Sequence, residues 1–142
     1  MASERFLDAN IFIRHFAADH ATHSPAATAL FDRLAAKQEA GWTSHLVMAE
    51  VAWVLTGPTY GFSREIVAQG LAAFVAARVV RMEAADAILE TLNLFATSNL
   101  GFMDSYNAVL VRRQPVPELY SFDRGFDRVS GITRIEPGRR GP

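Results

Sequence analysis

Residues 42–56 read WTSHLVMAEVAWVLT and contain the unit from which the fold can be inferred. The first residues, Trp42-Thr43-Ser44, form a short apolar segment that we interpret as a strand. From about Leu46 to Thr56 the segment continues as a helix that is apolar almost all round. A strand that passes directly into a helix is typical of a sheet covered by helices.

The order of a short strand followed by a helix recurs before and after residues 42–56. Proline and glycine separate the segments, as in Gly57-Pro58 and Gln114-Pro115. Together they predict an α/β fold with a mainly parallel sheet of four to five short strands. The strand candidates are residues 5–8, 42–44, 79–82, 119–122 and 132–135, and the helix candidates are residues 11–17, 25–40, 46–56, a helix after Ser63, 84–97 and 103–113.

Length and composition are those of one globular domain. The chain has 142 residues, half of them apolar and a fifth charged, and we expect a single domain over residues 1–142 with a flexible tail at 137–142. No apolar run is long enough to span a membrane. The absence of cysteine excludes disulfides and zinc–thiolate sites, and it fits a cytoplasmic protein. We expect Trp42 and Trp53 to lie in the core.

Four of the fifteen acidic residues are embedded in apolar sequence, which is unfavourable for a carboxylate without a partner. They are Asp8, Glu50, Asp104 and Asp123. Asp8 and Asp123 can instead serve as helix caps, and Glu50 can project from an exposed strip. If the strands are parallel, however, all four lie near one edge of the sheet, where ligands bind in such folds. Oxygen ligands alone favour Mg²⁺, which Mn²⁺ can replace.

These residues resemble the motifs of the PIN-domain nucleases, and within them the VapC-type toxins of bacterial type II toxin–antitoxin systems. The resemblance extends from Phe6 to about Ile135. Its motifs are Leu7-Asp8-Ala9-Asn10, Glu50 early in a helix, Gly101-Phe102-Met103-Asp104, and Ser121-Phe122-Asp123-Arg124-Gly125-Phe126. Ser105-Tyr106-Asn107 departs from the small residues that usually follow the third aspartate.

The resemblance implies a three-layer α/β/α sandwich and a Mg²⁺-dependent endoribonuclease that hydrolyses RNA phosphodiester bonds. It implies that Asp8 and Asp123 bind metal directly and that Glu50 and Asp104 do so directly or through water. Further roles are implied for three other residues. Asn10 and Ser121 would orient the ligands or the scissile phosphate, and Asp127 is either an accessory acid or a surface residue.

Partners are also implied by the resemblance. They are an RNA substrate, a cognate antitoxin protein that covers the carboxylates, and a second copy in a homodimer. Residues 112–142 contain seven arginines against four acids, which favours contact with a phosphate backbone. The candidates for such contacts are Arg14, Arg112, Arg113 and Arg124.

Other functions were compared with this one. Phosphatases of the haloacid dehalogenase type and receiver domains also place an aspartate after a first strand, but they need a later lysine, and Lys37 is the only lysine here. A catalytically silent PIN-like interaction module is the main alternative. His15, His20 and His23 are spaced as a second candidate metal site.

Overall fold

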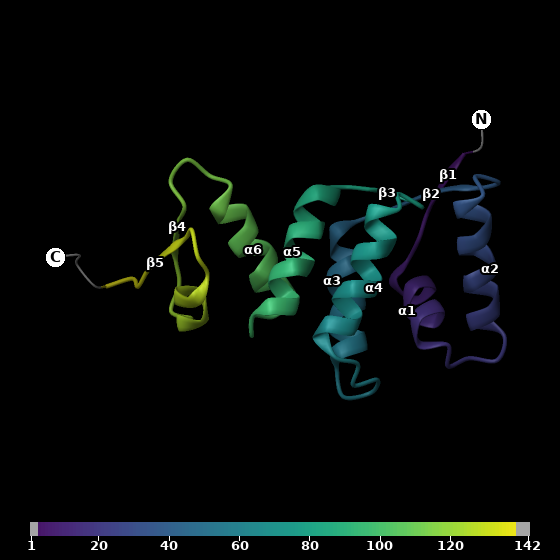
Figure 1. Cartoon of the computed structure of the whole chain (residues 1–142), viewed down its shortest axis with the longest axis horizontal. Helices are drawn as coiled ribbons and strands as arrows, with labels where there is room; N and C mark the ends of the chain where they lie inside the picture. The colour runs from purple at the N-terminus through teal and green to yellow at the C-terminus, as the bar shows by residue number, and fades with distance from the viewer. Residues whose placement is uncertain (1–2, 139–142) are drawn as a thin grey trace.

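The structure is a computed structural model that describes residues 3–138, and in it helices stand in a row beneath short strands (Figure 1). No helix within the described range is long and apolar enough to cross a membrane. The predicted tail at 137–142 lies mostly outside the described residues. In chain order the elements are β1 (Glu4–Phe6), α1 (Ala9–Ala17), α2 (His23–Ala35), β2 (Ala40–Thr43), α3 (His45–Thr56), α4 (Arg64–Ala76), β3 (Arg81–Met82), α5 (Ala85–Thr97), α6 (Phe102–Arg112), β4 (Glu118–Tyr120), the 3-10 helix η1 (Arg124–Arg128) and β5 (Thr133–Ile135).

The first sheet has the order β1-β2-β3, and both pairings are parallel. The pairing of β1 with β2 continues past the strand, where the Leu7 N–H donates to the Trp42 carbonyl at 2.9 Å. The two strands approach closely because Gly41 has no side chain. A Cβ at this position would lie 2.5 Å from Leu7 Cδ1. Gly41 is therefore part of β2, and the helix predicted over residues 25–40 ends earlier, at Ala35.

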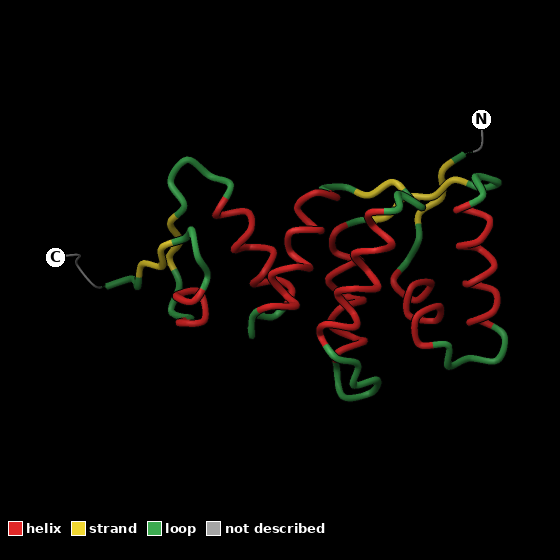
Figure 2. The backbone as a smooth tube through the Cα atoms, in the orientation of Figure 1, coloured by secondary structure: helices red, strands yellow, loops and turns green. Residues whose placement is uncertain are grey.

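The second sheet contains β4 and β5, again parallel, and it lies at the opposite end of the molecule from β1 (Figures 1 and 2). The α/β class with parallel strands is confirmed. The strands do not form one central sheet, however, but divide into sheets of three and two. The reason is that β4, β5 and η1 pack on α6 around a small core of their own, which consists of Leu100, Ala108, Phe126 and Val129.

The main core lies under the first sheet and contains residues of α1 to α6, with Phe12, Met48 and Ile88 fully buried. Helix α3 begins after Ser44, whose hydroxyl accepts from the Val47 N–H. Trp53, on the same helix, is 77% exposed, so the prediction that it lies in the core is wrong. The helix is apolar on more faces than its neighbours cover.

Helices α5 and α6 form an antiparallel pair that is held together at both ends. Near the C-terminal end of α6, Glu90 of α5 accepts from Arg112 at 2.8 Å and from Arg113 at 2.7 Å. At the other end, Arg64 of α4 donates to the Phe95 carbonyl at 2.8 Å and also binds the Leu100 carbonyl. These contacts fix the direction of α6 and of the second sheet that follows it.

Candidate functional site

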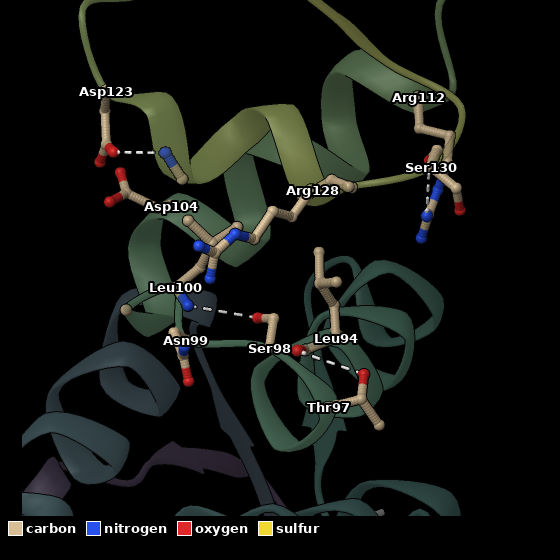
Figure 3. Close-up of a pocket in the computed structure, with 13 residues that line it drawn as sticks. Leu94, Thr97, Ser98, Asn99, Leu100, Asp104, Arg112, Asp123, Arg128 and Ser130 are labelled. Carbon is tan, nitrogen blue, oxygen red and sulfur yellow. Dashed lines mark hydrogen bonds between the residues drawn. The ribbon is translucent and has the colours of Figure 1, made fainter.

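Asp104 and Asp123 line one cavity of about 500 Å³. Asp104 lies in the first turn of α6, and Asp123 follows β4 as the N-cap of η1. Figure 3 shows their carboxylates pointing toward one another, with the guanidinium of Arg128 extending into the same space. Asn99 and Ser98, from the loop before α6, add polar groups to the lining. The cavity therefore joins two of the four predicted acids and two arginines, Arg112 and Arg128.

The turn that presents Asp123 is ordered by hydrogen bonds from its neighbours. Asp123 Oδ1 accepts from the Gly125 N–H at 2.8 Å, and the Ser121 hydroxyl accepts from the Asp123 N–H at 3.0 Å. Arg134 donates to the Ser121 carbonyl at 3.0 Å and binds Asp127 at 2.8 Å. Hydrogen bonds from Arg134 lower the pKa of Asp127. Asp127 is thus already paired, and Ser121 lies where it can orient Asp123.

Glu50 lies on the other side of the α6 N-terminus. It lines a groove of about 580 Å³ together with Asp104. The remaining surface of this groove is mainly apolar and includes Leu46, Trp53 and Met103, all of which are exposed. Asp104 therefore borders both hollows, and it shares one with Asp123 and the other with Glu50.

Asp8 lines neither of these two hollows. It is the N-cap of α1, where its Oδ1 accepts from the Ala9 N–H at 2.8 Å, and Asn10 is exposed in the first turn of the same helix. Within residues 3–138, no three acidic or histidine side chains are close enough to share a metal ion. The convergence of all four acids that the sequence predicts is therefore not present within a single chain.

The carboxylates that do meet fit a divalent cation by their chemistry. Glu50 and Asp104 have no hydrogen-bond or ion-pair partner among the described residues, and Asp104 faces another carboxylate. Two carboxylates that share one cavity repel each other, and a cation bound between them would offset this repulsion. With oxygen donors only, the hard ions Mg²⁺ and Mn²⁺ fit better than zinc.

The sequence alone does not rank the candidate arginines, and the structure shows that several of them are already paired. Arg14 binds Asp19 at 3.1 Å, and both Arg112 and Arg113 bind Glu90. Of the arginines in the C-terminal segment, Arg128 extends into the cavity, and no ion pair engages it among the described residues. Its position four residues after Arg124, on the short helix that Asp123 caps, was the available signal.

The three histidines do not form a metal site in the described part of the chain. His20 and His23 stack with ring centroids 3.9 Å apart, and His20 Nδ1 accepts from the His23 N–H at 2.9 Å. His15 Nδ1 is 2.8 Å from the Thr28 hydroxyl, and burial lowers its pKa. These rings are occupied in holding the α1–α2 connection.

Comparison with models of protein families matches residues 5–132 to the PIN domain. Comparison with curated proteins gives no match. The family match covers most of the chain, from β1 to the residue before β5, and so includes every element that carries one of the four acids.

Proposed function

Because this chain belongs to the PIN-domain family, whose members are generally nucleases that use divalent metal ions, we propose that it is a Mg²⁺-dependent endoribonuclease. Asp8, Glu50, Asp104 and Asp123 are the proposed metal-binding and catalytic acids. The observation that carries the proposal is the cavity in which Asp104 and Asp123 face one another. A pair of carboxylates that face one another, with Arg128 lining the same cavity, suits an ion and a phosphate better than a purely structural role.

In this proposal some residues bind the ion or the phosphate, and others position those that bind. Asp104 and Asp123 would hold the ion from two elements, and Ser121 would keep Asp123 in place through its backbone N–H. Arg128 would contact a phosphate oxygen of the RNA. When bound, Mg²⁺ neutralises charge on the phosphate and lowers the pKa of water to favour hydrolysis of the phosphodiester.

We also propose that the enzyme is the toxin of a toxin–antitoxin pair, with a cognate antitoxin protein and a homodimeric state. The groove beside Glu50 supports this, because Trp53 and Met103 expose apolar surface directly next to acids. An amphipathic helix with a basic residue at one end would bury the apolar side chains and neutralise the carboxylates. Such a partner would block the site.

The test is RNA cleavage by purified, partner-free protein with Mg²⁺, Mn²⁺ or chelator. Cleavage should require the metal and should fall by about 100-fold or more in Asp104→Asn and Asp123→Asn, since each removes a ligand charge. Asp32→Asn is the matched control, because Asp32 is exposed on α2 and lines neither the Asp104 cavity nor the Glu50 groove. Equal cleavage by the wild type, the two site variants and the Asp32→Asn control would contradict the proposed site.

A second candidate function, a catalytically silent interaction module, is favoured by the separation of Asp8 from the other acids within residues 3–138. Calorimetry with Mn²⁺ separates the two candidates. Heat of binding that disappears in Asp104→Asn supports the nuclease, whereas the absence of both binding and cleavage supports the module.

A further inference from the structure

Each of the two sheets in the described part of the chain has two edge strands, and β1 and β4 are the edge strands that carry exposed aromatic side chains. β1 is the edge strand of the first sheet, and all three of its residues are exposed. β4 pairs with β5 on one side only. Both strands carry exposed aromatic side chains, with Phe6 48% and Tyr120 76% exposed. A bare edge is a template for another strand, and natural proteins usually cover it.

The chain's own β4 is held away from its β1. The two strands lie at opposite ends of the long axis, with α5 and α6 between them (Figures 1 and 2). Glu90 ties α6 to α5 through two arginines, and Arg64 ties the connection between these helices to α4. Bringing β4 to β1 of the same chain would break these contacts or the small core under β4.

We infer that a second copy of this chain supplies the missing neighbour, so that β4 of one copy pairs in parallel with β1 of the other. The combined sheet would have the order β3-β2-β1-β4-β5, with its last two strands from the other copy. The exchange is reciprocal because each copy offers one β1 edge and one β4 edge. A two-fold dimer therefore leaves neither edge bare, which is why the occupant is a second copy.

The exchange also brings the separated acids together, and this part of the inference rests on the proposed function. Parallel strands end at the same edge of a sheet. Asp8 follows β1 and Asp123 follows β4, so strand pairing places Asp8 of one copy beside Asp123 of the other. Asp104 accompanies Asp123 because the two share a cavity. The site is thus completed between copies, with Asp8 from one and the other two aspartates from its partner.

Strand exchange can be tested without any activity, because the chain has no cysteine of its own. Full-length Phe6→Cys with a size tag and untagged Tyr120→Cys are unfolded together, refolded and treated with a short bis-maleimide. The inference predicts a covalent adduct of one tagged and one untagged chain. A mixture of tagged and untagged Tyr120→Cys controls for random collision. If the yield of mixed adduct does not exceed that of the control, the inference is overturned. It is also overturned if the double variant Phe6→Cys/Tyr120→Cys cross-links only within a monomer.

Complementation tests the shared site. Asp8→Asn and Asp123→Asn chains, each inactive alone, are refolded together in equal amounts. Half of the dimers are then mixed, and each mixed dimer has one intact site of two, so about a quarter of the wild-type cleavage should return. Asp104→Asn mixed with Asp123→Asn is the matched control and should restore nothing, because both residues come from the same copy. No recovery in the first mixture would overturn the shared site. If the wild-type protein does not cleave RNA, the proposed function fails while the cross-linking result still decides the exchange.

Discussion

Replacing Arg64 by alanine should destabilise the protein strongly, because this side chain anchors the connection that leads to Asp104. Its guanidinium donates to the Phe95 and Leu100 carbonyls and lies 3.9 Å from the centroid of the Phe95 ring. A hydrogen bond from a charged donor contributes about 1.5 kcal/mol or more, so two give about 3 kcal/mol. For a chain of this size the melting temperature should fall by roughly 10 °C.

The assay is thermal unfolding followed by circular dichroism, with denaturant unfolding for the free energy. Arg33→Ala is the control, because the Arg33 side chain is 47% exposed and binds only a surface acid, Glu39. Arg33→Ala should lower the free energy of unfolding by less than about 1 kcal/mol. If Arg64→Ala lowers the free energy of unfolding no more than the control does, the stability assigned to its two partly buried carbonyl contacts is refuted. Arg64→Lys keeps the charge but loses the planar guanidinium. Its loss of unfolding free energy should therefore lie between those of Arg64→Ala and Arg33→Ala.

Three further predictions concern single positions. Asp123→Asn should raise the melting temperature in chelator by about 2–4 °C, because it relieves repulsion from Asp104 while the amide oxygen still caps η1. Glu90→Gln should destabilise the protein at pH 7 but much less at pH 3. Hydrogen bonds from the neighbouring arginines lower the pKa of Glu90, so its contribution is present above the unfolded value of 4.5 and is lost as the pH falls through the folded value. Gly41→Ala should lower the free energy of unfolding by about 1–3 kcal/mol, since its Cβ would clash with Leu7.

Specific results would contradict these predictions. A lower melting temperature for Asp123→Asn in chelator would show that the carboxylate is satisfied by its cap alone. The urea unfolding difference between Glu90→Gln and wild type should narrow on acidification, and a constant difference from pH 7 to pH 3 would argue against the lowered pKa. Gly101→Ala controls for the glycine substitution, because nothing lies within 4 Å of its added Cβ.

Local structure followed closely from the sequence where a cap or a breaker marks the boundary. Ser44 and Ser63 both cap the helices predicted after them. The helix predicted from residue 25 begins earlier, at His23, and the Ser24 hydroxyl accepts from the His20 N–H. A local rule identifies residues that can start a helix, but tertiary packing chooses between neighbouring candidates.

The candidate site could be predicted only in part. Asp8 and Asp123 were weighed as caps and as ligands, and both side chains do accept hydrogen bonds from the backbone at the start of a helix. A cap uses few of the lone pairs of a carboxylate, so the two roles are compatible. Which acids meet was not predictable, because strand order across a sheet depends on contacts between distant segments. The sequence carried no local sign that β4 would lie beside β5 but away from β1.

The two hydrophobic cores differ in size, so we expect the regions above them to differ in the free energy of local opening. The core beneath β4, β5 and η1 has four buried side chains, whereas the main core extends over six helices. Backbone amides over the small core should exchange with solvent at a lower free energy of opening than those of α3. Asp123 belongs to the region that opens first. The fraction of molecules with an ordered Asp123 turn is therefore set by a local opening equilibrium, and it falls well before global unfolding begins.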